Sequence, residues 1–310
     1  TPHKSAATEM RIPQGFIQKL NPIFLVVNTL PFCDLFAKGK KEHLALTLLR
    51  LSVKSNILRV LITNDDGIDA PGIKLLEQTL QGLGELFVIA PQEEQSGSSH
   101  SLTIGKPVRI TEHDSHHIAI QGTPTDCVLL AHHSIMKEQI DLVASGINMG
   151  YNLADDVLYS GTVAAAMEGR LLRYPAIAIS ANRETEKIAQ SSLEFVREIC
   201  KMVLDCARPE FINVNIPPGE PKGVSVTRLG KRVYKDVVNR TRDENGEWHL
   251  ILSGELSSVS MEGSDTEALE SSYISVTPLH LDLTGFEKID ELREDLSVLP
   301  SFRSLNAKSP

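Results

Sequence analysis

The feature of the sequence that most constrains the fold is a short apolar run, which starts at Ile57 and delivers two adjacent carboxylates. The run is rich in β-branched residues, which is typical of a strand buried on both faces in a parallel sheet. It ends near Thr63, and Asp65, Asp66 and a glycine follow. Because a helical pattern begins soon after Pro71, we expect the carboxylates at the carboxyl edge of an open α/β sheet, where such folds bind ligands.

The carboxylates of Asp65 and Asp66 repel each other, so their pairing needs a physical reason. A hard divalent cation such as Mg²⁺ or Mn²⁺ supplies one, because it prefers oxygen ligands and neutralises the pair. The alternative is a solvated turn in which one aspartate caps the next helix, and a motif this short does not exclude it. Other parts of the chain have to decide between the two interpretations.

The composition is that of an ordinary globular protein with an acidic balance. Its 310 residues can form one large α/β domain or two modest ones, and 41% of them are hydrophobic. The net charge of −9 argues against binding to a nucleic-acid duplex, which needs a basic surface. An acidic protein still binds phosphate where a metal ion or a helix N-terminus supplies local positive charge.

Residues 1–56 differ from the rest of the chain in charge. They contain eight Lys and Arg against three Asp and Glu, a net charge of +5, so the remainder carries −14, since −9 minus +5 is −14. The apolar run Ile23–Val27 is too short to span a bilayer, and we expect no membrane partner. We interpret the segment as a basic N-terminal extension without a catalytic role in a cytoplasmic protein. The alternative is an organellar transit peptide.

The cysteines and the paired histidines do not form a metal-binding pattern. No two cysteines are spaced as Cys-x-x-Cys, and Cys127 and Cys200 lie in apolar helical patterns. This favours buried, reduced thiols in a reducing compartment. The histidine pairs at 116–117 and 132–133 consist of neighbours, whose side chains point apart on a helix or a strand. We therefore expect no shared histidine site.

A second buried-strand pattern, Leu86–Ala90, leads through Pro91 into a polar loop over residues 92–101. The loop contains Ser96, followed by a glycine and two more serines. Such small residues give the backbone freedom and offer hydroxyls and amides to an anion. A plain flexible loop is the alternative.

Two helix starts follow from their capping patterns. Thr123 is a candidate N-cap, and Pro124 suits the first helical position. Ser160, Gly161 and Thr162 precede an alanine-rich helical pattern, which gathers free amides, two hydroxyls and the positive end of the helix dipole at one point. This arrangement suits a phosphate group, although it is not a Walker A loop, because no Gly-Lys-Ser/Thr is present. A helix cap without a ligand is the alternative.

The remaining patterns complete an α/β domain that carries a hairpin arm. The expected elements are strands over Asp141–Ala144, Ala176–Ser180, Phe211–Ile216 and Tyr273–Thr277, a hairpin of Pro107–Thr111 with His117–Gln121, and a helix over Glu184–Leu204. An Asn-Gly turn at 245–246 marks the tip of a long hairpin arm over about residues 230–255. We therefore divide the chain into the extension 1–56, an α/β domain 57–285 that includes the arm, and a polar C-terminal tail 286–310 with a surface helix.

Polar side chains at three strand ends are expected to converge. Asp65 and Asp66 follow the first strand, Ser96 follows the second, and Asn148 and Asn152 follow the third. In a doubly wound sheet these ends meet in one crevice. All of these side chains offer oxygen, and the absence of Cys and His disfavours zinc. A hard cation with a phosphate on the neighbouring helix end favours phosphate-ester hydrolysis, in which the metal lowers the pKa of a water and one aspartate acts as general base.

Several longer motifs resemble those of the survival-protein SurE family, whose members are metal-dependent nucleoside monophosphate phosphatases. The motifs are Thr63–Gly67, Ser96-Gly97, Gly122–Val128, Ser145–Asn148, Tyr159–Gly169 and Tyr273–Leu279. The resemblance runs from Leu58 to about Thr284. Three residues depart from it: many relatives carry Asp-Arg where this chain has Gln92-Glu93, and a small polar residue is usual at His100. The substrate preference therefore stays open.

The resemblance implies a Rossmann-like, doubly wound, mostly parallel sheet with a β-hairpin arm that is exchanged between the subunits of a homodimer or tetramer. It implies release of phosphate from nucleoside 5′- and 3′-monophosphates, and in some members from polyphosphate as well. It further implies one divalent metal ion, Mg²⁺ or Mn²⁺, held by Asp65, Asp66, Ser96 and Asn148. The phosphate-binding set that it implies is Asn152, Ser160, Gly161 and Thr162.

Two other functions are compatible with parts of the pattern. An aspartyl-phosphate phosphatase would use Asp65 as its nucleophile, but that chemistry usually needs Asp-x-Asp, and the two acids are adjacent here. A nucleotide-binding regulator without catalysis is the alternative from another class. The set of oxygen donors argues against a regulator, because a pure binder has no need of so many metal ligands. Metal-dependent release of phosphate from AMP separates these classes.

Overall fold

The computed structural model describes residues 57–137, 139–182, 188–206, 210–235, 238–252, 255–259 and 261–302. All of them belong to a compact unit that starts at Asn56. The extension expected over residues 1–56, the end of the tail after residue 302, and Cys33 lie outside the described residues. None of the described helices has both the length and the apolar character that a membrane span requires.

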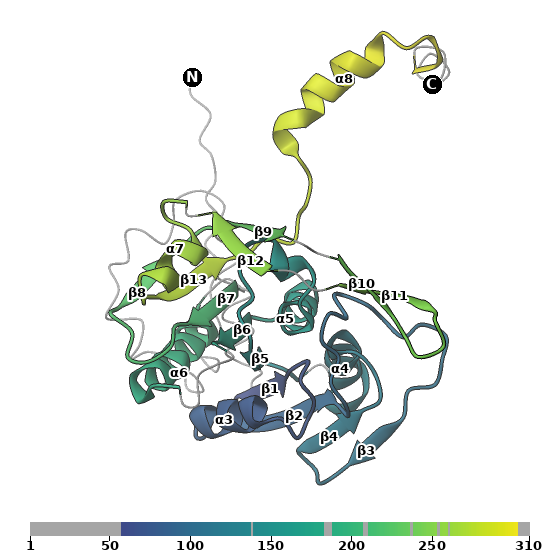
Figure 1. The fold of residues 1–310 in the computed structure, drawn as a ribbon. Helices are drawn as coiled ribbons and strands as arrows, with labels where there is room; N and C mark the ends of the chain where they lie inside the picture. The colour runs from purple at the N-terminus through teal and green to yellow at the C-terminus, as the bar shows by residue number, and fades with distance from the viewer. Residues whose placement is uncertain are drawn as a thin grey trace, which may run out of the picture. The chain divides into compact units, whose positions relative to one another are not determined.

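Within the described residues, nine strands form one sheet in the order β3-β4-β2-β1-β5-β6-β7-β13-β8 (Figure 1). They are β1 (Arg59–Thr63), β2 (Glu85–Pro91), β3 (Ile110–Glu112), β4 (His117–Ile120), β5 (Leu142–Met149), β6 (Ala176–Ala181), β7 (Phe211–Ile216), β8 (Val224–Val226) and β13 (Ile274–Pro278). The strands from β4 to β7 run parallel, whereas β3 and β13 pair antiparallel with β4 and β7. The predicted α/β class with a mostly parallel sheet is confirmed.

The direction in which the chain builds this sheet reverses between β1 and β5. From β1 the chain moves through β2 to β4 on one side, and then it crosses to β5, β6 and β7 on the other. The register of β1 with β5 places Thr63 beside Ser145. The residues that follow β1 therefore emerge at the topological switch point, where open α/β sheets bind ligands.

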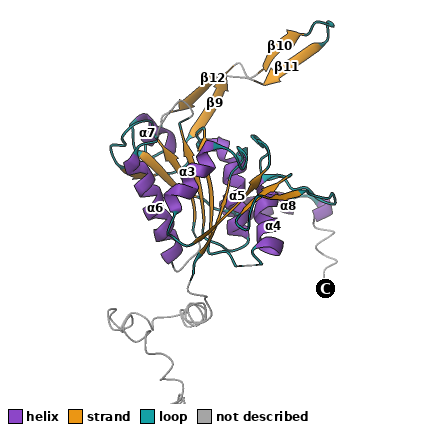
Figure 2. Ribbon diagram, turned by 90° about the horizontal axis from the view of Figure 1, so that it is seen from below, coloured by secondary structure: helices purple, strands orange, loops and turns teal. Residues whose placement is uncertain are grey.

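Helices cover both faces of the sheet (Figure 2). The described helices are α3 (Pro71–Leu80), α4 (Pro124–Leu130), α5 (Gly161–Leu171), α6 (Gln190–Asp205), α7 (Asp265–Glu270) and α8 (Ile289–Ser297), with short helices η2 (Ala131–Ile135), η3 (Ala154–Leu158) and η4 (Phe286–Lys288). Val60 and Ile62 of β1 join the apolar cluster under α3 and α6, and Leu61 joins the cluster under α4 and α5. Both faces of β1 are therefore buried, as its uninterrupted apolar pattern predicts.

Both predicted helix starts are confirmed. At α4, Thr123 Oγ1 accepts a hydrogen bond from the Asp126 amide at 3.1 Å, and the Asp126 carboxylate accepts one from the Thr123 amide at 2.8 Å. These two bonds form a capping box, with Pro124 at the first helical position. At α5, Ser160 Oγ accepts from the Val163 amide at 3.1 Å.

Strand β5 is longer than the sequence pattern predicts. The apolar run ends at Ala144, but the strand continues through Met149. The backbone at Gly146 has a φ of +133°, and a Cβ there would lie 2.3 Å from the Ile179 carbonyl oxygen. Glycine thus lets β5 approach β6 closely, and the glycine-rich segment stays in the sheet instead of forming a loop. Asn148 is consequently held within the strand pairing, opposite Ser180.

Two helices differ from the expected pattern. The helix expected over Glu184–Leu204 corresponds to α6, which starts at Gln190, and residues 183–187 lie outside the described part of the chain. Helix α7 has no counterpart among the expected elements, because its six residues are too few to show a helical period. Its N-cap is Ser264, whose Oγ accepts from the Glu267 amide at 3.2 Å.

The predicted hairpin arm is present and reaches further than expected. Strand β9 (Lys231–Lys235) pairs with β12 (Glu255–Val259), and β10 (Val238–Arg242) pairs with β11 (Trp248–Leu252). The arm therefore extends to Val259 rather than to residue 255. The Gly246 amide donates to the Asp243 carbonyl at 3.0 Å, which closes the predicted Asn-Gly turn. Exchange of the arm between subunits stays a prediction.

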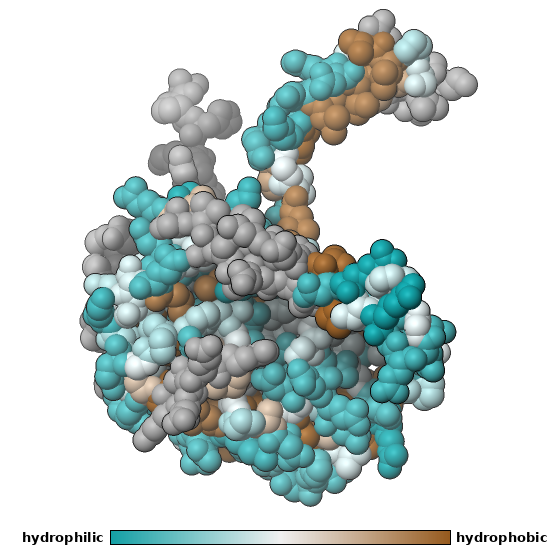
Figure 3. Space-filling model, in the orientation of Figure 1, coloured by the Kyte–Doolittle hydropathy of each residue, from teal (hydrophilic) through white to brown (hydrophobic). Residues whose placement is uncertain are grey.

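Helix α8 is the surface helix expected in the C-terminal tail. Leu292 within it, and Val298 and Leu299 just after it, are exposed. Figure 3 shows hydrophobic residues gathered along one side of this segment, with hydrophilic residues along the other. The described part of the tail is therefore amphipathic and not uniformly polar.

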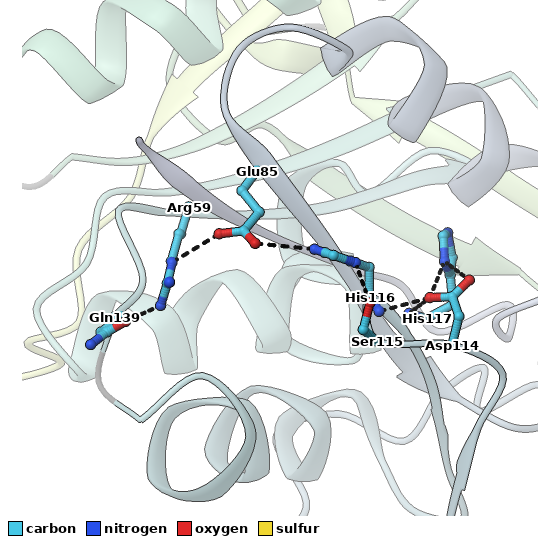
Figure 4. A network of polar contacts seen from close by, with 7 residues as sticks. All are labelled: Arg59, Glu85, Asp114, Ser115, His116, His117 and Gln139. Carbon is cyan, nitrogen blue, oxygen red and sulfur yellow. Dashed lines mark hydrogen bonds and ion pairs between the residues drawn. The ribbon is translucent and has the colours of Figure 1, made fainter. Parts of the chain in front are cut away.

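A polar network joins the strands at the amino end of the sheet (Figure 4). The carboxylate of Glu85 lies 3.0 Å from Arg59 Nε and 3.1 Å from His116 Nε2. The adjacent His117 turns the other way, and its Nε2 lies 3.0 Å from Glu77 of α3. The two histidines of this pair therefore have separate partners.

Candidate functional site

Asp65 and Asp66 lie in the loop after β1, which the Asn64 side chain closes. Asn64 Nδ2 donates to the Gly67 carbonyl at 2.8 Å. Asp65 is buried, with 5% of its surface exposed, and Thr162 Oγ1 donates a hydrogen bond to Asp65 Oδ1. The end of β1 and the first turn of α5 are therefore in direct contact. The sequence predicted a metal site at one and a phosphate site at the other.

Burial and charge both act on the carboxyl group of Asp65. Burial raises its pKa, the hydrogen bond from Thr162 lowers it, and the Asp66 carboxylate raises it again, with a net upward shift. An ionised Asp65 is thus costly unless a positive charge is near. A cation beside the two carboxylates relieves the burial and the repulsion together, so this pair of donors fits a divalent metal ion.

The loop after β2 lies against Asp65. The Gln95 amide donates to the Asp65 carbonyl at 2.7 Å, and Ser96 is the next residue. The Ser96 side chain is exposed, and its Oγ donates to the Glu94 carboxylate at 2.6 Å. The backbone therefore brings Ser96 to the site. To bind a metal ion, its hydroxyl would have to rotate away from Glu94.

The far end of this loop is anchored to α5 and to the turn before it. Ser99 Oγ donates to the Leu158 carbonyl at 2.7 Å, and the Ser99 amide donates to the Tyr159 carbonyl at 3.2 Å. His100 Nε2 lies 2.8 Å from the largely buried Glu168 carboxylate. His100, where the family resemblance predicts a small polar residue, thus has a structural partner on α5 that sequence reasoning did not find.

Gly161 opens α5 where there is no room for a side chain. A Cβ there would lie 2.8 Å from Asp65 Cβ and 3.0 Å from Ser98 Oγ. The Ser98 hydroxyl is buried and has no hydrogen-bond partner among the described residues. Ser98 therefore belongs to the site although it was not among the predicted site residues. Its signal in the sequence is its place in the serine-rich loop.

The first turn of α5 already interacts with an anion, which is the carboxylate of Asp65. Thr162 donates to it from both its hydroxyl and its backbone amide. The Ser160 hydroxyl caps the helix through the Val163 amide. Part of the predicted phosphate set is thus engaged within the protein, and Gly161 is the member whose backbone faces the site without a side chain. One aspartate does accept hydrogen bonds at a helix start, but the helix is α5 and not the one that follows Asp65.

Asn148 and Asn152 are fixed by different contacts. Asn148 Nδ2 donates to the Gly150 carbonyl at 2.6 Å, so its amide oxygen is the atom that a cation would take. Asn152 is buried, and its Nδ2 donates to Ser180 Oγ at 2.8 Å. The Asn152 amide donates to Asn215 Oδ1 at 2.9 Å. These bonds position Asn152 over β6 and β7, and its role toward a phosphate stays a prediction.

The comparisons with known proteins decide the family. Residues 60–236 match the family described as Survival protein SurE. The chain belongs to the SurE family. It is 41% identical to a protein named 5′-nucleotidase SurE from Desulforudis audaxviator (strain MP104C), over 249 residues that cover 76% of this chain and 97% of the relative. It is also 41% identical to a protein of the same name from Syntrophotalea carbinolica (strain DSM 2380 / NBRC 103641 / GraBd1), over 238 residues that cover 74% of this chain and 94% of that relative.

The fold agrees with this membership. The crystal structure of the SurE protein from Aquifex aeolicus matches with a TM-score of 0.67 and 40% sequence identity, and the match covers 76% of this chain and 98% of that one. The predicted resemblance to the SurE family is therefore confirmed by sequence and by structure. The metal ligands and the phosphate-binding residues remain predictions for this chain.

Two further carboxylates organise the site from outside the predicted set. Asp265 is fully buried and accepts from the Ala154 amide at 2.8 Å and the Gly230 amide at 2.7 Å. It thereby joins the loop after β5 to the start of the arm. Asp126 accepts from the Thr103 amide at 2.9 Å, which fixes the chain beyond the serine-rich loop. The spacing of residues in the sequence does not predict either of these contacts.

Proposed function

We propose that this chain is a phosphoric monoester hydrolase, a 5′-nucleotidase of the SurE type that depends on one divalent metal ion, Mg²⁺ or Mn²⁺. Its substrates are nucleoside 5′- and 3′-monophosphates, with polyphosphate as a further substrate. The names of the relatives support the nucleotidase class. The observation that carries the proposal is the contact of Asp65 with Gly161 and Thr162 at the switch point of the sheet.

The metal ligands in this proposal are Asp65, Asp66, Ser96 and Asn148. A divalent ion bound there supplies Lewis-acid polarisation of a phosphoryl oxygen and activation of a water molecule. The fit is supported by the buried Asp65 carboxyl, whose pKa is raised by burial and by the charge of Asp66. All four donors are oxygen atoms, which hard divalent cations prefer.

In this proposal the remaining roles, which are to position the carboxylate, to bind the phosphate and to transfer a proton, belong to side chains and backbone groups of the chain. Thr162 holds the Asp65 carboxylate at the first turn of α5, and Gly161 leaves room for a phosphoryl oxygen to approach the helix N-terminus. Asp66 is less buried than Asp65, and we assign it the proton transfer from water. Ser160 and Asn152 complete the phosphate-binding set of the proposal.

A nucleotide-binding regulator without catalysis is the alternative, and one assay separates it from an enzyme. The assay is phosphate release from a panel of nucleoside 5′- and 3′-monophosphates and polyphosphate, each with Mn²⁺, with Mg²⁺ and with a chelator. We expect metal-dependent release from the 5′-monophosphates. Binding of the same nucleotides without any release of phosphate would favour the regulator and overturn the enzyme.

The assembly in this proposal is a homodimer or tetramer formed through the arm. Strands β10 and β11 pair with each other in a sheet separate from the nine-stranded one. Their residues Val238, Leu250 and Ile251 are exposed. A two-stranded hairpin is marginally stable by itself, so a partner surface would stabilise it.

A further inference from the structure

A cavity of about 310 Å³ lies at the carboxyl edge of the sheet, next to the residues of the candidate site. Tyr151 and Leu153 line it from the loop after β5, Asn182 from the end of β6, and Pro218 from the loop after β7. Leu269 of α7 contributes a further wall. The volume is at the lower end of the range for small-molecule sites.

The position of this cavity relative to the candidate site follows from the strand order. Tyr151 and Leu153 flank Asn152, which is bonded to Ser180, two residues before Asn182. Asp65 follows β1, and β1, β5 and β6 are successive neighbours in the sheet. Because neighbouring strands are about 4.8 Å apart, the end of β6 is about 10 Å from the end of β1. A group esterified to a phosphate at Asp65 is thus within reach of the cavity.

The cavity walls favour a flat, uncharged group with polar edges. Tyr151 is partly buried and its hydroxyl is hydrogen-bonded to Asn182; burial raises the pKa of this phenol, which therefore stays neutral near pH 7. Leu153 and Leu269 supply buried apolar contacts. Aromatic rings bind bases by stacking, and amide side chains form hydrogen bonds with base edges.

The charges around the cavity disfavour a second phosphate. Arg232 lines the cavity, but its guanidinium is ion-paired with Asp156. Glu270 is exposed at the same cavity, and a carboxylate there is an acceptor for hydroxyl groups. A sugar with free hydroxyls matches this acceptor better than a phosphate group does.

We propose that this cavity binds the nucleoside part of the substrate, with Tyr151 stacking on the base and Asn182 and Glu270 contacting its polar groups and the sugar. The inference rests on the proposed function and extends it, because it assigns the residues that distinguish a nucleotide from other phosphate monoesters. The metal and the helix N-terminus act on the phosphate of every ester, whereas this cavity acts on nucleosides alone.

The first test compares two phosphate esters in wild type and in Tyr151→Ala and Tyr151→Phe. The esters are AMP and β-glycerophosphate, which has no base. In Tyr151→Ala we expect the ratio of kcat/KM for AMP to that for β-glycerophosphate to fall by about tenfold, as expected for the loss of one base–aromatic contact. Tyr151→Phe keeps the ring and is expected to retain most of the ratio. Tyr174→Ala, at the opposite edge of the sheet, is the matched control.

The second test measures binding without turnover. Calorimetric titration of adenosine, which has no phosphate, is carried out on the full chain without metal, for wild type and for both Tyr151 variants. We expect binding by wild type and Tyr151→Phe, and binding about tenfold weaker by Tyr151→Ala.

The outcomes separate the two proposals. If wild type hydrolysed neither ester with Mn²⁺ or Mg²⁺, the proposed function would be wrong, and the adenosine titration would still test the cavity. If wild type hydrolysed both esters but Tyr151→Ala left the ratio and the adenosine affinity unchanged, the nucleoside would bind elsewhere. An equal loss for both esters with unchanged adenosine binding would also contradict the cavity assignment.

Discussion

Asp65 takes part in both halves of the site. It is a proposed metal ligand, and it also accepts hydrogen bonds from the hydroxyl and the amide of Thr162 at the start of α5. From the sequence, the metal and the phosphate halves were separate motifs almost a hundred residues apart in the chain. The structure makes them neighbours, so substitutions in one half are expected to affect the other.

Substitution of Asp66 tests the metal site. Asp66→Asn removes one negative charge from the proposed ligands, so we expect a folded protein that has lost most of its Mn²⁺ affinity and turnover. Calorimetry with Mn²⁺ and a kinetic assay with AMP measure both. Asp69→Asn is the control, because Asp69 lies in the same loop but is 87% exposed and paired with Lys74. Wild-type activity of Asp66→Asn at limiting metal would exclude Asp66 as a ligand.

Substitution of Gly161 tests the coupling of the two halves. A Cβ at this position would collide with Asp65 Cβ, at 2.8 Å, so Gly161→Val is expected to displace the carboxylate as well as to block the phosphate. We expect a rise in KM or loss of turnover together with weaker Mn²⁺ binding. Gly97→Val, where an added Cβ meets no atom within 4 Å but φ is +72°, controls for general damage to the loop. Normal Mn²⁺ affinity in Gly161→Val would show that the two halves are independent.

At the scale of the elements, the turn between β3 and β4 is tied to α3 by a titrating histidine. Burial lowers the pKa of His117, but Asp114 and Glu77 together outweigh it, so the pKa is raised above 6.5. A group whose pKa is raised by folding stabilises the native state fully when the pH is below the pKa that the group has in the unfolded chain. That stabilisation is lost as the pH rises through the folded-state value.

The upward shift of the His117 pKa predicts how the stability depends on pH. The difference in the free energy of unfolding between wild type and His117→Gln should be largest below pH 6.5 and should shrink as the pH rises above it. Chemical denaturation at a series of pH values measures it, and His133→Gln, an exposed histidine of η2, serves as the control. A difference that grows with rising pH would show that the ion pairs of His117 do not stabilise the fold.

The arm is the second element with a testable role. Its outer hairpin exposes apolar residues, and Arg240 and Arg242 both lie over the Trp248 ring, at 3.6 Å and 4.3 Å from its centroid. We expect deletion of residues 238–252 to lower the oligomeric state in sedimentation, because the proposed partner surface is removed. The deletion leaves Arg232 and the cavity residues in place. A dimer that persists after the deletion would exclude the outer hairpin as the principal contact.

At the scale of the whole molecule, metal binding is expected to stabilise the fold. A ligand that binds only the native state at 100 times its Kd stabilises it by about 2.7 kcal/mol. We therefore expect Mn²⁺ to raise the free energy of unfolding of wild type by about this amount, and to have little effect on Asp66→Asn. Denaturation with and without Mn²⁺ measures the difference. No stabilisation of wild type at saturating Mn²⁺ would contradict a resident metal site.

Local sequence pattern determined much of the architecture. The uninterrupted apolar pattern of Val60–Ile62 required burial on both faces, because each face of a parallel sheet is covered by helices. Thr123 and Ser160 marked helix starts, because a cap acts on amides within the same turn. The Asn-Gly turn at the tip of the arm is equally local. The end of the first strand pattern placed Asp65 at the crevice, because a strand end fixes the position of the residue that follows it.

The tertiary structure alone decided which side chains meet. Ser98 beside Gly161, Asn152 bonded to Ser180, and Asp265 joined to Ala154 are contacts between segments distant in sequence. No periodicity or capping rule encodes them. The continuation of β5 past Ala144 also depended on the close approach of Gly146 to Ile179 on the next strand. A local pattern shows how one segment forms its own hydrogen bonds and which of its faces is buried. A site forms where several segments pack together and exclude water, so its contacts depend on the tertiary structure.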